Sequence, residues 1–138
     1  MKITNIIAIV LMTCCCQVSA KDTIERKHLG DWEKDLGYTQ TVKVGNTLYL
    51  SGITSGAATM ADQINEIYTL ITKILAEYNL TTAAIIKETV YTTDIDALKI
   101  NAGHRKQFFK NNHYPAATWV QVERLIVPEL LLEVEIIA

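Results

Sequence analysis

The chain has 138 residues, of which 49% are apolar and 20% are charged. This length and composition are typical of one globular domain and argue against extensive disorder. Its 13 Lys and Arg residues are balanced by 15 Asp and Glu residues, and the formal charge of −2 leaves no basic excess to neutralise phosphates. We therefore expect no nucleic-acid partner.

Residues 1–20 have the pattern of a secretory signal peptide. Lys2 is a short positive region, Ile3 to Met12 is mostly apolar, and Val18-Ser19-Ala20 provides small residues before a cleavage site. A membrane anchor is the alternative, but roughly 10–14 apolar residues are few for a span that needs about 20. A lipid-anchored form is a second alternative, because Leu11-Met12-Thr13-Cys14 loosely resembles a lipoprotein cleavage box. We predict cleavage after Ala20 and a secreted or periplasmic protein with no further membrane contact.

Cleavage would change the composition of the protein. Removing 20 of the 138 residues leaves 118, and the loss of Lys2 leaves 12 basic against 15 acidic residues, a net charge of −3. The only cysteines, Cys14, Cys15 and Cys16, would also be lost. The exported chain would then have no disulfide, no thiol nucleophile and no thiolate metal ligand.

The first elements after this segment are an arm and a hairpin. Residues 21–35 are polar, with Trp32 as their main apolar anchor, and predict a loosely packed N-terminal arm before a domain over residues 36–138. Thr39 to Val44 and Thr47 to Ser51 predict two strands, because Gly45-Asn46 between them suits a type II′ turn. The Gly-containing stretch Gly52 to Thr59 predicts a loop.

A long helix and a strand follow. Thr59-Met60-Ala61-Asp62 matches a capping box at a helix start. Apolar residues then recur at helical spacing, at Ile64, Ile67, Tyr68, Ile71, Ile74, Leu75 and Tyr78. Ile85 to Thr93 is short and β-branched and predicts a strand, so strand, helix and strand suggest a right-handed parallel crossover.

The last third predicts one more helix and two strands. The helix is expected over Ala97 to Lys110, although Gly103 weakens it, and the strands over Ala116 to Glu123 and Leu130 to Ile137. The order β-β-α-β-α-β-β predicts an α+β fold with two helices on one face of a sheet. No segment remains for the other face, yet the last strand is apolar on both sides, so we expect that face to pack on another subunit.

Most catalytic signatures are absent. The stretch from Ser51 to Gly56 lacks the spacing of a nucleophile elbow, and His28, His104 and His113 lack the spacing of metal ligands. We predict no metal and no cofactor.

A few polar residues stand in unexpected places. Asn101 falls on the predicted buried side of its helix, Glu133 and Glu135 interrupt an apolar strand, and Tyr38 and Ser51 flank the hairpin. Each is either a site residue or an edge residue with a satisfied hydrogen bond.

Five segments, in this chain order, resemble the Rid/YjgF family of reactive intermediate deaminases over residues 36–138. They are Gly37-Tyr38-Thr39-Gln40 with Val44 to Gly52, Lys87 to Ile95, Asn101 with Phe108-Phe109, Tyr114-Pro115-Ala116 to Val122, and Leu132 to Ala138. The resemblance implies a chorismate-mutase-like fold and a homotrimer with ligand clefts between subunits. It also implies hydrolysis of reactive enamines and imines, such as 2-aminoacrylate and its imine, to 2-keto acids and ammonia, with an Arg that binds the substrate carboxylate and a Glu that activates water.

The resemblance assigns site residues one by one. Glu133 matches the catalytic Glu, and Tyr38, Ser51, Gly52 and Asn101 match substrate-binding positions. The Arg position holds Ala117, and the position two residues later, often Cys in the family, holds Trp119. Arg124 matches a separate family Arg outside the carboxylate-binding position.

Two hypotheses follow from this pattern. The first is an exported imine or enamine deaminase that acts on an unidentified small molecule in a cleft between subunits. The second is a non-catalytic, small-ligand-binding trimer of the same fold, because the loss of the Arg removes an ion pair to the substrate.

Overall fold

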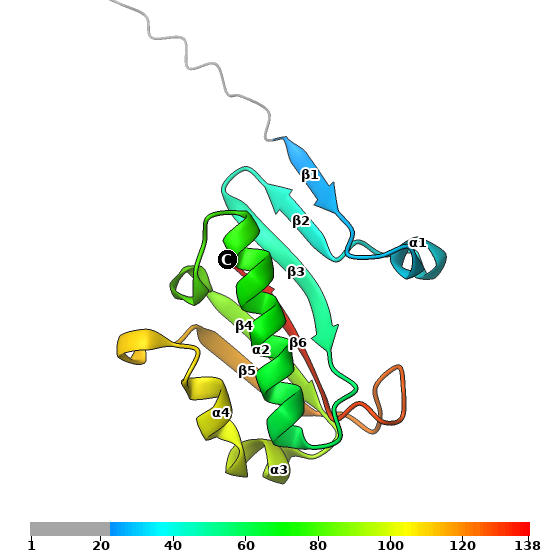
Figure 1. Ribbon diagram of the computed structural model, residues 1–138, viewed down its shortest axis with the longest axis vertical. Coiled ribbons are helices and arrows are strands. Elements are labelled where there is room, and N and C mark those ends of the chain that lie inside the picture. Colours follow the sequence, from blue (N-terminus) through cyan, green and yellow to red (C-terminus); the bar gives the residue numbers. More distant parts are fainter. Residues whose placement is uncertain (1–22) are drawn as a thin grey trace, which may run out of the picture.

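A computed structural model describes residues 23–138, so the predicted signal peptide and its cysteines lie outside the described residues (Figure 1). The strands are β1 (Ile24–Lys27), β2 (Thr41–Val44), β3 (Thr47–Thr54), β4 (Lys87–Thr92), β5 (Ala116–Gln121) and β6 (Leu132–Ile137). The α-helices are α1 (Trp32–Leu36), α2 (Met60–Glu77), α3 (Ile95–Ile100) and α4 (Ala102–Lys106), with short 3-10 turns at Thr82–Ala84 and Lys110–Asn112.

The six strands form one mixed sheet in the order β1-β2-β3-β6-β4-β5. Every neighbouring pair is antiparallel except β4 and β5. Strands β3 and β4 are both antiparallel to β6 and therefore run parallel to each other. The expected parallel crossover through α2 is confirmed, with β6 inserted between its two strands.

Helix α2 provides most of the core. Its predicted start is confirmed, because the Thr59 hydroxyl accepts the N–H of Asp62 at 3.2 Å. Its predicted apolar stripe is buried against the sheet, and the side chains of Ile64, Ile67, Tyr68, Ile71, Ile74 and Leu75 are at most 2% exposed. Burial of each such side chain contributes about 1.5–3 kcal/mol, so this helix fixes the layer over the sheet.

Three predicted segments differ from the structure. The predicted N-terminal arm contains regular structure, because β1 pairs with β2 and α1 follows β1 in the chain. The predicted helix from Ala97 to Lys110 is broken at Asn101, which ends α3 and begins α4. The predicted loop begins later than expected, because β3 continues through Gly52 to Thr54 with a register shift between Leu50 and Ile53.

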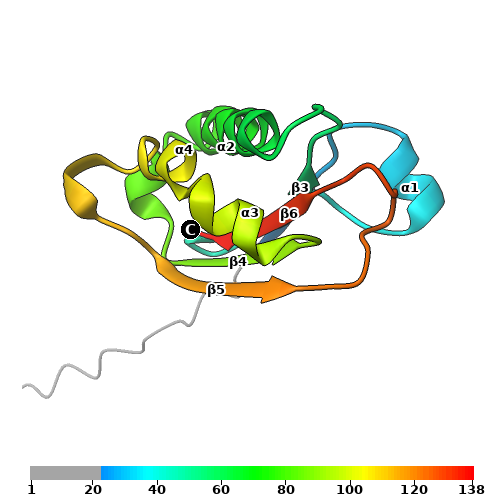
Figure 2. The same ribbon diagram turned by 90° about the horizontal axis from the view of Figure 1, so that it is seen from below.

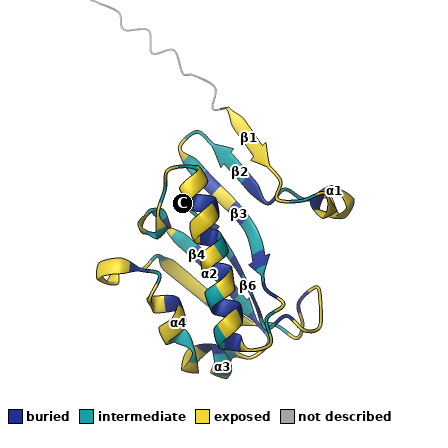
Figure 3. Ribbon diagram, in the orientation of Figure 1, coloured by how far each residue is buried: buried dark blue, intermediate teal, exposed yellow. Residues whose placement is uncertain are grey.

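The layers are unequal. Helices α2, α3 and α4 lie on one face of the sheet, and α1 lies beyond its edge (Figure 2). The buried residues follow α2 and the strands beneath it, whereas β1 is exposed throughout (Figure 3). Side chains of β6 alternate between the two faces, with Leu132, Val134 and Ile136 buried, so Glu133 and Glu135 point to the face without helices. Within residues 23–138, no helix is both long and apolar enough to cross a membrane.

Candidate functional site

A cleft of about 620 Å³ brings together four of the predicted site residues. Tyr38 comes from the segment after α1, Ser51 and Gly52 from β3, and Glu133 from β6. The cleft is completed by Trp32, Leu36, Thr54, Ile126, Val127 and Leu130. Strands β3 and β6 are neighbours, with Thr54 opposite Glu133, and this pairing places the carboxylate at the cleft.

Gly52 leaves room for the side chain of Glu133 to lie close to the backbone of β3. A Cβ atom on Gly52 would lie 1.7 Å from Oε1 of Glu133, which is far inside any real contact. Only glycine therefore lets the carboxylate lie against the β3 backbone without displacement. The match of Gly52 to a family cleft position has a physical cause in this chain.

The electrostatics of Glu133 favour its neutral form. Burial raises the pKa of its carboxyl above the ordinary value, and the nearby Glu135 carboxylate raises it further. Glu135 in turn accepts the Tyr91 hydroxyl at 3.2 Å. A carboxyl with a raised pKa can exchange a proton nearer neutral pH than an ordinary one, which suits general acid–base chemistry.

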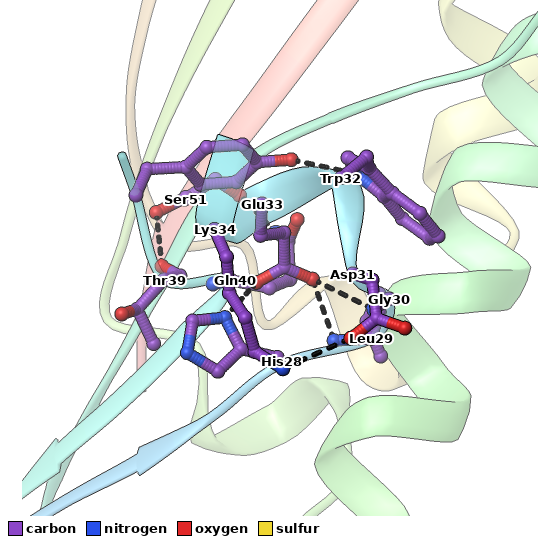
Figure 4. Close-up of polar contacts among 11 residues, drawn as sticks. His28, Leu29, Gly30, Asp31, Trp32, Glu33, Lys34, Thr39, Gln40 and Ser51 are labelled. Carbon is purple, nitrogen blue, oxygen red and sulfur yellow. Dashed lines mark hydrogen bonds and ion pairs between the residues drawn. The ribbon is translucent and has the colours of Figure 1, made fainter. Parts of the chain in front are cut away.

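Tyr38 and Ser51 have defined partners. The Tyr38 hydroxyl accepts the indole N–H of Trp32 at 3.1 Å. The Ser51 hydroxyl donates to the carbonyl oxygen of Thr39 at 2.8 Å, which binds it to the neighbouring strand segment (Figure 4). Ser51 is thus held as a wall of the cleft, and none of the ten described residues that line it is a His that could make Ser51 a nucleophile.

Glu33 holds the α1 side of the cleft in place. Its fully buried carboxylate accepts the backbone N–H groups of Leu29 at 2.6 Å, Gly30 at 3.1 Å and Gln40 at 2.7 Å, and it pairs with Nδ1 of His28 at 2.8 Å (Figure 4). Burial alone would raise the pKa of Glu33, but these four hydrogen bonds outweigh it and hold that pKa below the ordinary value. One side chain therefore ties β1, α1 and β2 together.

Replacing Glu33 by Ala is expected to loosen this corner. Three backbone donors lose their acceptor, which should lower the free energy of unfolding by about 2–4 kcal/mol. Because the folded pKa of Glu33 is depressed, its stabilisation is present at neutral pH and is lost as the pH falls through that folded pKa. Hydrogen exchange of residues 23–40 at pH 7 measures the first effect, and thermal melting at a series of pH values from 7 down to about 2 measures the second. The exposed Asp35→Ala is the control, and equal melting of the two variants would contradict the prediction.

The other three predicted residues do not line this cleft within one chain. Glu88 lies opposite Ala117 and Val90 opposite Trp119 in the β4–β5 pairing. Because Glu88 and Val90 are buried on the helix-covered face, Ala117 and Trp119 lie on that face, opposite to Glu133. Asn101 lies between α3 and α4, where its amide donates to the carbonyl oxygen of Ala97 at 2.9 Å.

A buried polar cluster lies under β4 and was not predicted. The Arg105 guanidinium is 2.6 Å from a carboxylate oxygen of Glu88, and both side chains are at least 93% buried. The Tyr68 hydroxyl donates to Glu88 at 2.9 Å and accepts Nε of Arg105 at 3.2 Å. The Trp119 indole donates to the same carboxylate at 3.3 Å. Trp119 is therefore committed to this cluster and not to the Glu133 cleft.

Sequence reasoning also missed Trp32, Leu36, Ile126 and Val127 as cleft residues. Trp32 and Leu36 are four residues apart, a spacing that places both on one side of a helix and could have indicated α1. Ile126 and Val127 lie in an irregular segment, where no periodicity marks an orientation. Within residues 23–138, no group of three or more His, Cys, Asp or Glu side chains could hold a metal ion.

The fold and cleft define a small α+β protein with helices on one face of a mixed sheet and a ligand-sized cleft between β3 and β6. The model of the Endoribonuclease L-PSP family matches residues 33–138. RutC family proteins from Haemophilus influenzae and Pasteurella multocida are 34% and 32% identical to this chain over 111 residues, which cover 73% of it and 85% of each relative.

A solved structure agrees with these matches. The Mycobacterium tuberculosis structure, reported as a member of the highly conserved YjgF/YER057c/UK114 family, has a TM-score of 0.77 and 26% identity, covering 84% of this chain and 98% of that one. The chain therefore belongs to the Rid/YjgF family, and the predicted α+β fold of that family is confirmed.

Proposed function

We propose that this protein is a hydrolytic imine or enamine deaminase that acts on a small molecule at the Glu133 cleft. The single observation that supports this most is the carboxyl of Glu133, half-buried against Gly52 with a raised pKa. A pair of Tyr and Ser side chains and an apolar wall surround it, as a pocket for a small organic substrate requires.

The chemistry needs only water and Glu133. A water oxygen adds to the carbon of the C=N bond, and the Glu133 carboxylate accepts the proton that this water loses. The resulting carbinolamine receives that proton on nitrogen, and its C–N bond breaks to release ammonia. The hydroxyl proton passes to the ammonia as the carbonyl group forms. The balance is R₂C=NH₂⁺ + H₂O → R₂C=O + NH₄⁺. The proton that Glu133 takes up returns to the leaving nitrogen, so the residue ends as it began.

The proposal includes a homotrimer in which the edge of one subunit completes the cleft of the next. The face of the sheet without helices supports it, as does the separation of Ala117, Trp119 and Asn101 from Glu133 within one chain. We also keep the proposal that residues 1–20 are a signal peptide and that the protein is secreted or periplasmic. Comparing the intact mass of the cellular and exported protein tests cleavage after Ala20.

The alternative is a non-catalytic ligand-binding trimer. It is favoured by Ala117, which leaves the position of the family Arg without a charge. A ribonuclease function is less well supported, because the ten residues that line the cleft include no Lys or Arg to bind phosphates.

The test of the proposed function is imine hydrolysis by the purified protein. Imines are generated in solution by an amino acid oxidase or an amine oxidase, and the imine left after a fixed time is trapped with semicarbazide. Hydrolysis faster than in buffer for any imine of the panel supports a deaminase. No acceleration, together with saturable binding of a small molecule in the cleft, favours the ligand-binding alternative.

Removing the charge of Glu135 should move the pH profile of this reaction. In Glu135→Gln the neighbouring negative charge is lost, so the pKa of Glu133 is expected to fall while staying above the ordinary value, because burial remains. A general base acts when it is ionised, so the acidic limb of kcat/KM should shift to lower pH. A kcat/KM profile between pH 4 and pH 9 measures it, and an unchanged limb would mean that another group titrates there.

A further inference from the structure

The walls of the Glu133 cleft are apolar and exposed. Trp32 and Leu36 of α1 are 54% and 61% exposed, and Ile126 and Val127 on the segment between β5 and β6 are 68% and 45% exposed. All four line the same cleft with Glu133. Large apolar side chains gathered around one carboxylate in a concave site are typical of a site for an apolar ligand.

Trp32 has a hydrogen-bond partner at this site. Its indole N–H donates to the Tyr38 hydroxyl at 3.1 Å, and both side chains line the cleft. The adjacent Glu33 anchors the helix through three backbone N–H groups. Gly37 closes α1 with a φ of 77°, and the Tyr38 N–H then returns to the Glu33 carbonyl oxygen at 3.0 Å. The short helix that carries Trp32 is thus anchored at both ends by hydrogen bonds within the chain.

The charge that one subunit contributes to the cleft disfavours one class of ligand. Among the lining residues of that subunit Glu133 is the only acid, and none is Lys or Arg. A ligand carboxylate would therefore meet a like charge from this subunit and no cation to pair with. Arg124 does not line this cleft but an adjoining hollow, which shares Ile126 and Glu133 with it and is also lined by Glu135. An iminium cation, in contrast, would be attracted by both the carboxylate and the aromatic rings.

We propose that the cleft selects ligands with a bulky aromatic or branched apolar group and no carboxylate, and that Trp32 is the specificity-determining residue. This inference rests on the proposed imine hydrolysis for its reaction, R–CH=NH₂⁺ + H₂O → R–CHO + NH₄⁺. Imines of this class are the direct products of the two-electron oxidation of primary amines. The reaction that supplies the substrate is therefore an amine oxidation and not an amino acid oxidation.

Four imines in a two-by-two design test the selectivity. Phenylethylamine and ethylamine are oxidised to imines without a carboxylate, and phenylalanine and alanine to imines that differ from these by one carboxylate. We expect kcat/KM to be at least 10-fold higher for the phenylethylamine imine than for each of the other three. Preference for either carboxylate-bearing imine would overturn the inference while leaving the deaminase in place, and Arg124→Ala would then show whether Arg124 binds that carboxylate.

Variants of Trp32 separate specificity from folding. Trp32→Ala should raise KM for the phenylethylamine imine at least 10-fold and lower the ratio of kcat/KM for the phenylethylamine imine to that for the ethylamine imine at least 10-fold, whereas Trp32→Phe should restore the aromatic preference. Ile24→Ala removes an exposed apolar side chain of β1 away from the cleft and is the matched control. Equal losses on both imines would mean that Trp32 has only a structural role.

A binding measurement distinguishes this inference from the proposed function. Phenylacetone and phenylpyruvate share the benzyl group and the carbonyl and differ in a methyl group against a carboxylate. Titration calorimetry should show phenylacetone binding at least 10-fold tighter, with the difference lost in Trp32→Ala. If no imine is hydrolysed but this difference is present, the selectivity stands and the deaminase proposal fails. If no imine is hydrolysed and phenylacetone does not bind, the inference fails as well.

Discussion

Replacing Glu133 by Gln is expected to lower kcat/KM for imine hydrolysis about 10²–10⁴-fold, the range that a positioned general base provides. Gln has the shape of Glu and keeps the contact with Gly52, but its amide cannot accept a proton from water. The loss should appear mainly in kcat, because the apolar wall of the cleft that binds the substrate is unchanged.

The fold should not suffer from this change. The raised pKa of Glu133 means that its ionised form is disfavoured in the folded protein by burial and by Glu135. As the pH rises from the pKa of Glu133 in the unfolded chain to its higher pKa in the folded protein, ionisation of Glu133 lowers the free energy of unfolding. The amide of Gln does not ionise, so the variant does not lose this stability. The melting temperature of Glu133→Gln is expected to equal or exceed that of the unchanged protein near neutral pH.

The control for this experiment is Glu129→Gln, which changes an exposed carboxylate near the end of the segment before β6. Its kcat/KM should match that of the unchanged protein. If Glu133→Gln keeps more than about a tenth of the activity, the water is activated by another group and the assignment of Glu133 is wrong. If both variants lose activity alike, the loss reflects the charge of the region and not a general base.

Periodicity and turn chemistry were enough to predict much of the fold. Helix α2 was predicted with its start at Thr59, because a capping box and an apolar stripe are local signals that the tertiary structure then reinforces. The β2–β3 hairpin was predicted in the same way, and Gly45 has the positive φ, 57°, that its turn requires.

Non-local interactions explain what sequence reasoning missed. Strand β1 has four exposed residues and no alternating pattern, and only its pairing with β2 makes it a strand. Glu33 looked like one more surface charge in a polar arm, yet its backbone donors at Leu29, Gly30 and Gln40 bury it. The Leu29 and Gly30 donors lie only four and three residues before Glu33, a capping spacing that the sequence did contain, whereas the contact with Gln40 depends on how the chain returns after α1.

Some residues of the candidate site could be predicted from the sequence, and others depend on contacts between distant segments. The cleft brings together Tyr38, Ser51, Gly52 and Glu133 because β3 and β6 are neighbours in the sheet. The family resemblance implied this grouping, whereas the pattern of strands alone did not. Trp119 was predicted to line the cleft, but in the single chain its indole N–H faces the buried Glu88. The orientation of Trp119 depends on Glu88, which lies 31 positions earlier in the chain. Sequence reasoning did not pair these two residues.

The buried pair of Glu88 and Arg105 should be the most sensitive point of the fold. Glu88→Ala is expected to lower the free energy of unfolding by about 3–5 kcal/mol, because it leaves the charge of Arg105 buried without a counter-ion. The Tyr68 hydroxyl would also lose the acceptor of its proton. For a domain of this size the melting temperature should fall by roughly 10–20 °C.

An exposed pair serves as the control. Lys99 and Asp96 lie 3.2 Å apart with side chains 64% and 83% exposed. Lys99→Ala should change the free energy of unfolding by less than about 1 kcal/mol, because water solvates both charges whether or not they are paired. Denaturant titration of both variants, with the slope compared, measures the two effects on one scale.

Removing the whole cluster should be milder than breaking it. In the triple variant Glu88→Leu, Arg105→Met and Tyr68→Phe, every buried polar group except the half-buried Trp119 indole is replaced by an apolar one of similar size. We expect this variant to recover most of the stability that Glu88→Ala loses, because desolvation of a buried ion pair offsets much of its attraction. A triple variant less stable than Glu88→Ala would mean that the aromatic rings of Phe109, Tyr114 and Trp119 around Arg105 stabilise its cation directly. A Glu88→Ala variant within about 1 kcal/mol of the unchanged protein would mean that water reaches the guanidinium.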